Sequence, residues 1–137
     1  MKVTTHTDGG ARGNPGPAAA GIVIKNTAGE ILAAYGEYLG HQTNNFAEYS
    51  ALISALKKAH ELGASEVDCM LDSELIVKQM RGEYKVKEPT LQKLFIQAHN
   101  AAIQFKKVSY RHTLRQNNKE ADAEVNKVLD HYNSLSS

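Results

Sequence analysis

One stretch near the N-terminus decides the fold: Lys2-Val3-Thr4-Thr5-His6-Thr7-Asp8-Gly9-Gly10-Ala11-Arg12-Gly13-Asn14-Pro15-Gly16-Pro17. Its first part, from Thr4 to Thr7, carries β-favouring residues and predicts a strand. Asp8 stands where we expect that strand to end, and a loop rich in glycine and proline follows. A carboxylate beside such a loop can bind a hard cation that a phosphate also approaches. An Asp-Gly turn is the simpler explanation of this pair taken alone.

The length and composition indicate an ordinary globular chain. Its 137 residues are 42% hydrophobic and 23% charged, which suits one domain with a substantial core. We therefore predict a single domain over residues 1–137, with residues 133–137 as a disordered tail. Nothing in the sequence demands more than a monomer.

Two observations bear on the cellular compartment. The sequence has neither an apolar run long enough to span a membrane nor a signal-peptide pattern after Met1. The single cysteine, Cys69, excludes an internal disulfide and lies in an alternating segment, so we expect a buried thiol. Together these features favour a protein without membrane contact in the reducing cytoplasm.

The rest of the chain predicts a mixed α/β fold. Strands are expected over residues 18–24, 30–39, 65–71 and 105–111, and helices over 43–63, 73–81, from 89 and from 117 or 118. Short connections join the first three strands and predict an antiparallel meander. The later strand–helix–strand order predicts a parallel crossover. The expected architecture is therefore a five-stranded mixed sheet, three antiparallel strands followed by parallel strands, flanked by helices.

Four acids stand out in this pattern: Asp8, Glu48, Asp72 and Asp122. Two of them end predicted strands, and two lie early in predicted helices beside the apolar stripe. Ligand sites in open α/β sheets lie off the carboxyl ends of the strands. Converging carboxylates repel one another, and Mg²⁺ or Mn²⁺ held by oxygen ligands would compensate them. Two such ions can clamp the attacking and leaving oxygens of a phosphodiester.

Charge is unevenly distributed, although the net charge is only +1. Residues 105–119 contain five basic residues and no acid, namely Lys106, Lys107, Arg111, Arg115 and Lys119. Such a run is most often a solvated face, and it indicates a nucleic-acid footprint only where it flanks a site.

Around the four acids the sequence resembles type 1 ribonuclease H. Residues 7–17, 43–48, 71–75 and 118–122 look like the family's four motifs, in order and with fitting spacing. The order of the predicted elements agrees as well, so the resemblance covers nearly the whole chain. It implies a ribonuclease H-like fold.

The resemblance implies an endoribonuclease that hydrolyses the RNA strand of RNA–DNA hybrids and leaves 5′-phosphate and 3′-hydroxyl ends. It implies two Mg²⁺ ions per site, with Mn²⁺ as a substitute. Asp8 would bridge both ions, Asp122 would help to hold the ion that activates water, and Glu48 and Asp72 would hold the ion facing the leaving oxygen. Two alternatives remain: a catalytically weak hybrid- or RNA-binding module of the same fold, and another nuclease or recombinase of the superfamily. A pure binder gains nothing from clustered acids beside phosphates, which argues against the first.

In the family, a histidine ten residues before the last acid assists proton transfer or product release. His112 occupies that position. Residues 111–117 differ from the family's usual loop with glycine and histidine, so a surface histidine at a strand end is the alternative.

The resemblance also implies contacts with the hybrid. The matching positions are Gly13, Asn14, Asn44 and Asn45, with Ser73 and Gln79 as weaker candidates. Amide groups can contact the 2′-hydroxyls that distinguish RNA from DNA, and helix capping is the alternative for Asn44 and Asn45. The chain lacks the basic, Trp-bearing handle of some bacterial members, and we expect Arg81, Lys85 and Lys87 to replace it in part.

Overall fold

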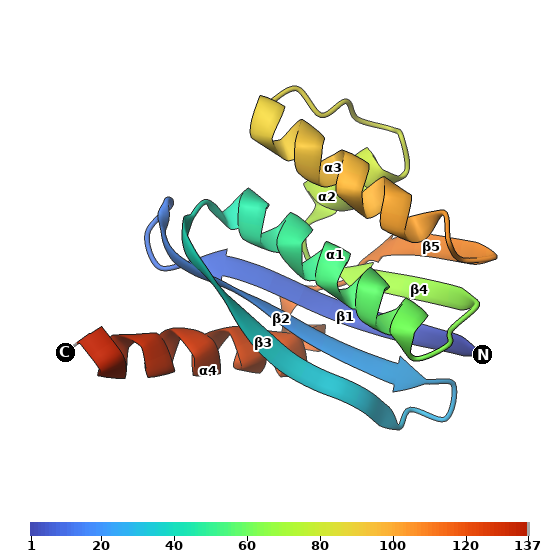
Figure 1. Cartoon of the computed structure of the whole chain (residues 1–137), viewed down its shortest axis with the longest axis horizontal. Helices are drawn as coiled ribbons and strands as arrows, with labels where there is room; N and C mark the ends of the chain where they lie inside the picture. The colour runs from blue at the N-terminus through green and yellow to red at the C-terminus, as the bar shows by residue number, and fades with distance from the viewer. Residues whose placement is uncertain (137) are drawn as a thin grey trace.

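The computed structural model describes residues 1–136 and arranges them as one sheet with helices on both faces (Figure 1). In chain order the elements are β1 (Lys2–Ala11), β2 (Gly16–Asn26), β3 (Ile31–Gln42), α1 (Asn44–Glu61), β4 (Glu66–Leu71), α2 (Glu74–Met80), α3 (Pro89–Ala102), β5 (Lys107–His112), a 3₁₀ turn (Arg115–Asn117) and α4 (Lys119–Ser136). α1 packs on β1 and β2, α3 packs on α1, and α4 covers the opposite face of β1, β2 and β3.

The sheet has the strand order β3-β2-β1-β4-β5. β1 pairs with β2, and β2 with β3, in antiparallel fashion, whereas β1–β4 and β4–β5 are parallel. The predicted mixed sheet, with three antiparallel strands followed by parallel strands, is therefore confirmed. The parallel ladder between β1 and β4 ends where Thr7 pairs with Leu71, which is the carboxyl end of β4.

The first strand is longer than the sequence indicated. β1 continues to Ala11 because its antiparallel ladder with β2 extends to the Ala11–Ala18 pair. Parallel pairing with β4 stops at Thr7. The expectation that Asp8 ends a strand is thus wrong for the strand and right for the parallel ladder.

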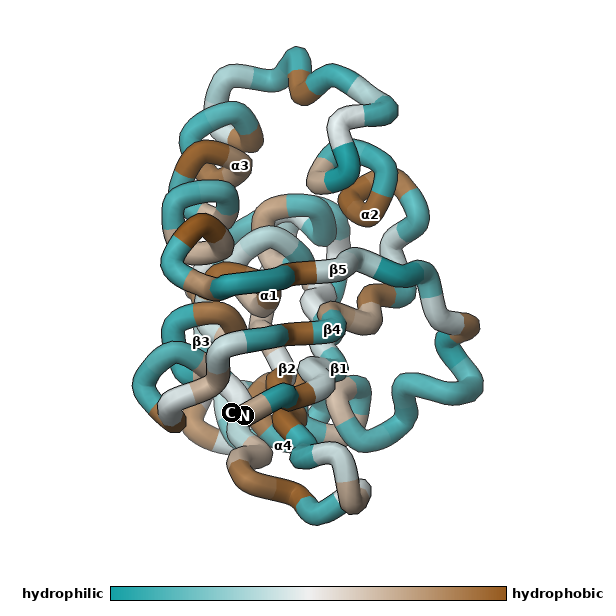
Figure 2. Tube along the Cα trace, turned by 90° about the vertical axis from the view of Figure 1, so that its right-hand side faces the viewer, coloured by the Kyte–Doolittle hydropathy of each residue, from teal (hydrophilic) through white to brown (hydrophobic). Residues whose placement is uncertain are grey.

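The main core lies between the sheet and α1. Tyr49, Leu52 and Leu56 of α1 are fully buried, and Cys69 of β4 is buried beside them, as predicted. The connector from α2 to α3 is mostly hydrophilic (Figure 2). Among residues 1–136, no helix is both long and apolar enough to cross a membrane.

Two further expectations need correction. The apolar pattern of residues 73–81 favours Leu75, Ile76 and Met80 as the inward face of α2, but Leu75 is 40% exposed and Val77 is buried instead. Residues 133–136 were expected in a frayed tail, but α4 continues to Ser136; Ser137 lies outside the described residues. The end of α4 is held to the sheet by Tyr132, whose ring stacks on Tyr38 of β3 at 4.4 Å between centroids.

Candidate active site

Asp8 lies beside a close contact between α1 and the sheet. A Cβ added to Gly9 would lie 2.2 Å from the carbonyl carbon of Ala47 and 2.3 Å from the backbone nitrogen of Glu48. Only glycine permits this contact between the backbones of β1 and α1. The contact brings Glu48, in the first turns of α1, against Asp8.

α4 reaches Asp8 from the other face of the sheet by the same means. Gly21 of β2 is the register partner of Asp8. A Cβ on Gly21 would lie 2.1 Å from the carbonyl oxygen of Ala121. The absence of a side chain lets the first turn of α4 settle on the sheet, and that turn carries Asp122.

The fourth acid follows β4. Asp72 comes directly after Leu71, which pairs with Thr7 in the parallel ladder. Asp8, Glu48 and Asp72 can each place a carboxylate oxygen within 4.8 Å of the others. Four segments distant in the sequence therefore converge at one end of the sheet, as the spacing of the acids predicted.

Two of the four acids are unusually buried for charged groups. Asp8 is 7% and Glu48 is 8% exposed, and Oε2 of Glu48 has no hydrogen-bond partner among the described residues. Burial of a carboxylate without a partner is costly. Such an atom is a free ligand position, and oxygen donors at this separation fit a hard divalent cation.

The electrostatics of the cluster favour either protonated carboxyl groups or a bound cation. Burial, followed by the charge of Asp72 and the hydrogen bond with Asp122, raises the pKa of Asp8 to about 7. Burial and the charges of Asp72 and Asp8 also raise the pKa of Glu48, against a lowering by the backbone N–H of Gly9. A bound cation would reverse both effects because it stabilises the ionised carboxylates.

Arg115 is a site residue that sequence reasoning placed only within the basic run. Nη2 of Arg115 lies 3.7 Å from Oδ1 of Asp122, and its charge lowers the pKa of Asp8. Nδ2 of Asn126 donates to the other oxygen of Asp122 at 3.3 Å. The one sequence signal for Arg115 was its place in a basic run seven residues before the last acid.

The acids and Arg115 line one hollow of about 450 Å³, together with Gly9, Arg12, Asn44 and Asn126. His112 does not line it. This histidine is the last residue of β5, is exposed, and its charge helps to lower the pKa of Glu74. Its predicted catalytic role stays a prediction.

The asparagines tie the β1–β2 turn to α1. Thr43 is the N-cap of α1 because its Oγ1 accepts a hydrogen bond from the backbone of Phe46 at 3.2 Å. The capping explanation for Asn44 and Asn45 is therefore wrong. Asn44 instead accepts from Ala11 N–H at 2.8 Å and donates its own backbone N–H to Oδ1 of Asn14 at 3.0 Å.

A second hollow, of about 570 Å³, opens beside these amides. Asn14, Asn44 and Asn45 all line it. Gly13, in the same turn, has a φ of +89° that favours glycine. The structure thus brings these four predicted contact residues together, next to the acids.

The remaining predicted contacts are dispersed. Gln79 is buried and accepts a hydrogen bond from the hydroxyl of Tyr49 at 2.5 Å, which speaks against a substrate contact. Ser73 caps α2, since its Oγ accepts from Ile76 N–H at 3.3 Å. Arg81 donates through Nε to the carbonyl of Tyr110 at 2.8 Å. Lys85 and Lys87 are exposed on the α2–α3 connector.

Comparisons with known proteins match this arrangement. A family model described as reverse transcriptase-like matches residues 6–128. A bifunctional protein of Mycobacterium tuberculosis is 44% identical over 131 residues, which are 95% of this chain and 36% of that protein. The ribonuclease HI of Halobacterium salinarum is 40% identical over 94% of this chain and 65% of its own length. The chain thus spans about a third of the mycobacterial relative and just under two thirds of the archaeal one.

Solved structures agree along their whole length. The crystal structure of RNase H1 from Halobacterium salinarum superposes with a TM-score of 0.93 and 39% identity, covering 96% of this chain and 99% of that one. The crystal structure of LC11-RNase H1 in complex with an RNA/DNA hybrid gives a TM-score of 0.91 and 43% identity, covering 95% and 98%.

Proposed function

This chain belongs to the type 1 ribonuclease H family, and on that premise we propose that it hydrolyses the RNA strand of RNA–DNA hybrids as an endonuclease. The observation that carries the proposal is the cluster of Asp8, Glu48 and Asp72, whose carboxylate oxygens lie within 4.8 Å of one another. Since Asp122 reaches the same hollow, a single copy of the chain supplies all four acids. We therefore propose that the monomer is active.

The four acids would hold two divalent ions, Mg²⁺ or in its place Mn²⁺. When bound, such ions supply Lewis acidity and stabilise the attacking and leaving oxygens of a phosphodiester. The buried, unpartnered Oε2 of Glu48 supports this ligand set. Hydrolysis would leave 5′-phosphate and 3′-hydroxyl ends.

The protein's own residues would position the hybrid. Asn14 and Asn44 are linked by a hydrogen bond of 3.0 Å, which holds the β1–β2 turn against α1 beside the acids. Their remaining amide groups and the exposed Asn45 can contact 2′-hydroxyls of the RNA strand. Lys85 and Lys87 would contribute phosphate contacts, which supply affinity without sequence preference.

Arg115 would steady the acid cluster. Its guanidinium lies beside Asp122 and opposes the repulsion that raises the pKa of Asp8. Its side chain is 82% exposed, so it can turn toward a phosphate of a bound strand. His112 ends β5 outside the hollow, so it would assist proton transfer or product release only after a movement that brings its side chain to the hollow.

Cleavage of a labelled hybrid tests the proposal. We expect the wild-type chain to cut the RNA strand in Mg²⁺, to stop in EDTA, and to leave double-stranded RNA and DNA intact. Asp72→Asn should lose nearly all activity. Asp68→Asn is the matched control, because Asp68 is a β4 carboxylate paired with Lys2 at 3.2 Å and does not line the hollow. Full activity of Asp72→Asn, or equal activity in EDTA, would overturn the proposal.

A further inference from the structure

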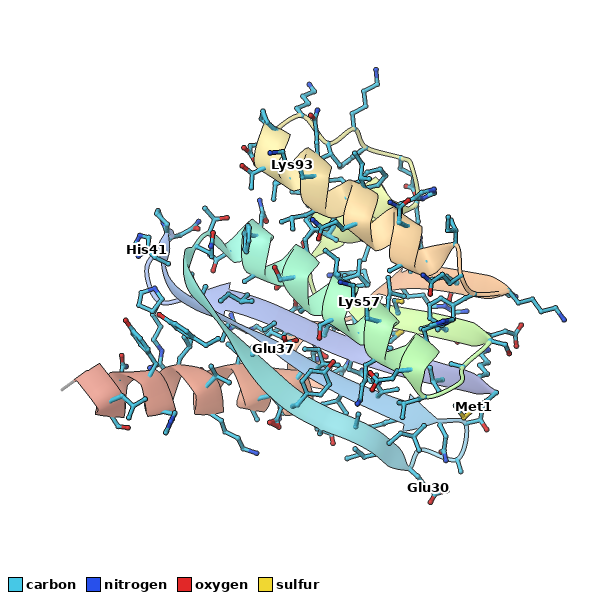
Figure 3. All side chains as sticks on the ribbon, viewed as in Figure 1. Met1, Glu30, Glu37, His41, Lys57 and Lys93 are labelled. Atoms are coloured by element: carbon cyan, nitrogen blue, oxygen red, sulfur yellow. The ribbon has the colours of Figure 1, made fainter. Side chains whose placement is uncertain are left out.

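A large hollow of about 1010 Å³ lies outside the acid-lined site. Its walls come from β3, α1 and the part of α3 from Thr90 to Gln97. Figure 3 labels one charged residue on each of these elements: Glu37 on β3, Lys57 on α1 and Lys93 on α3. α1 contributes one helical face, which runs from Phe46 to Glu61. We call this hollow the α1 groove.

The α1 groove carries a small excess of positive charge, because three lysines and two glutamates are among the residues that line it. Within residues 1–136, neither Lys57 nor Lys93 forms an ion pair, and both are exposed. Lys58 lies 3.7 Å from Glu61, so those two charges offset each other. Glu37 accepts a hydrogen bond from Ser54, which itself bonds Tyr35. Lys57 on α1 and Lys93 on α3 are thus the lysines of the groove that no ion pair engages within residues 1–136.

Aromatic and apolar surfaces line the same groove. Phe46 is half-buried at the end of the groove nearest the N-terminus of α1, and Tyr35 of β3 is half-buried in its wall with its hydroxyl bonded to Ser54. Ile53 and Leu94 form part of the floor. A positively charged groove with aromatic side chains is the general means by which proteins bind single-stranded nucleic acid.

The α1 groove continues from the proposed hybrid site. It shares Phe46 and Thr90 with the hollow that the asparagines line. That hollow in turn shares Asn44 with the acid-lined hollow. The three hollows therefore form one track from the carboxylates, past the amides, to the two lysines.

We propose that the α1 groove binds a single-stranded extension of the hybrid, with Lys57 and Lys93 on its phosphates and Phe46 against a base. The inference rests on the proposed function because the extension enters from the hybrid site. The groove face of α1 spans fifteen steps of about 1.5 Å, or about 22 Å. At about 3.4 Å per stacked nucleotide, that length accepts about six nucleotides.

Binding measurements on the Asp8→Asn background test the groove without hydrolysis. The probes are a blunt hybrid, the same hybrid with an eight-nucleotide extension at either end of its DNA strand, and the free eight-nucleotide strand. We expect the extension to tighten binding and Lys57→Ala with Lys93→Ala to abolish that gain. Affinity for the blunt hybrid should stay unchanged. Lys106→Ala with Lys107→Ala is the charge-matched control, since both lysines are exposed at the start of β5.

A salt series gives a second readout. Two single-strand phosphate contacts contribute a slope of about 1.4 to log affinity against log salt. The gain from the extension should therefore weaken about sevenfold when salt rises fourfold. The groove variant should lose this slope for the extended hybrid and keep its slope for the blunt one. It should also cleave blunt hybrid normally when Asp8 is restored.

Distinct results overturn the inference and the proposed function. An extension that adds no affinity, or a gain that survives in the groove variant, would overturn the groove while blunt hybrid still binds. An acidic, leucine-bearing peptide serves as a further probe, and lysine-dependent binding of the peptide but not of the extension would also overturn it. If blunt hybrid fails to bind at all, the proposed function fails. In that case, binding of the free eight-nucleotide strand that depends on Lys57 and Lys93 would still support the groove. No such binding would overturn the groove as well.

Discussion

Replacing Asp8 by Asn should stabilise the metal-free protein while it removes cleavage. Asp8 is 7% exposed and faces Asp72 and Asp122, so its ionised form is repelled by its neighbours and poorly solvated. Asparagine keeps the size of the side chain and removes the charge. The buried negative charge that would let Asp8 bind a metal ion therefore destabilises the fold when no cation is present.

The pKa of Asp8 gives the size of the effect. It rises from an ordinary 3.8 to about 7, and each pKa step corresponds to about 1.4 kcal/mol. Ionised Asp8 therefore costs the folded, metal-free protein about 4 kcal/mol relative to the unfolded chain. Asp8 titrates together with the neighbouring acids, so only part of this cost belongs to Asp8 alone. We therefore expect Asp8→Asn to raise the free energy of unfolding by about 2–4 kcal/mol. At about 4 °C per kcal/mol, this is a Tm increase of about 8–16 °C.

The direction in which stability changes with pH follows from the same two pKa values. Between the unfolded pKa of 3.8 and the folded value of about 7, the folded protein holds a proton that the unfolded chain has released. This contribution to stability is complete below the unfolded value and is lost as pH rises through about 7. The gain from Asp8→Asn should thus be largest at pH 8 and fall to about 1.5 kcal/mol at pH 5.

Urea and thermal unfolding in EDTA, at pH 8 and at pH 5, measure this difference. Saturating Mg²⁺ should reduce the stability difference between the two proteins, because the cation appreciably stabilises only the wild-type acid cluster. Asp68→Asn is the control of opposite sign, since Ser109 and Lys2 lower the pKa of Asp68 and its neutralisation should destabilise the fold. An Asp8→Asn protein that is no more stable than wild type at pH 8 in EDTA would refute the electrostatic reasoning.

Three further predictions concern packing, proton transfer and substrate grip. Gly9→Ala should destabilise the fold by several kcal/mol and abolish cleavage, whereas Gly10→Ala, whose added Cβ would meet only a methyl group at 3.9 Å, should be tolerated in urea melts. His112→Ala should slow turnover by less than the ~10²–10⁴-fold of general acid–base loss, and an unchanged single-turnover rate with slower steady state would assign the residue to product release. Lys85→Ala with Lys87→Ala should raise KM, leave kcat near wild type and flatten the salt slope by about 0.9 per lost contact; an unchanged slope would show that the hybrid is held elsewhere.

Local patterns in the sequence predicted much of this fold correctly. Period-two alternation and the glycine turns located the strands, and the apolar stripe of α1 correctly marked Tyr49, Leu52 and Leu56 as core. These patterns did not predict the ends of strands or helices that pairing or packing with another segment extends. β1 reaches Ala11 only because β2 pairs with it, and α4 reaches Ser136 with Tyr132 held on Tyr38.

Side-chain direction in a short helix was another limit. α2 has seven residues, which is two turns, so one misjudged position shifts the whole inward face. Leu75 is exposed and Val77 is buried, whereas the apolar pattern of the segment favoured Leu75 for the inward face. The choice depends on how α2 sits against β4 and β5, and its own sequence does not contain that information.

For the site, the sequence by itself identified the four acids that converge, because two of them follow predicted strand segments and two lie early in predicted helices. Only the tertiary structure decided how close they come. Backbone contacts at Gly9 and Gly21 press α1 and α4 onto the sheet, and the resulting burial sets the pKa of Asp8. The placement of Arg115 beside Asp122 and the continuity of the α1 groove were decided there too. Distances and desolvation between segments far apart in the chain arise only when those segments pack, whereas periodicity is a property of each segment alone.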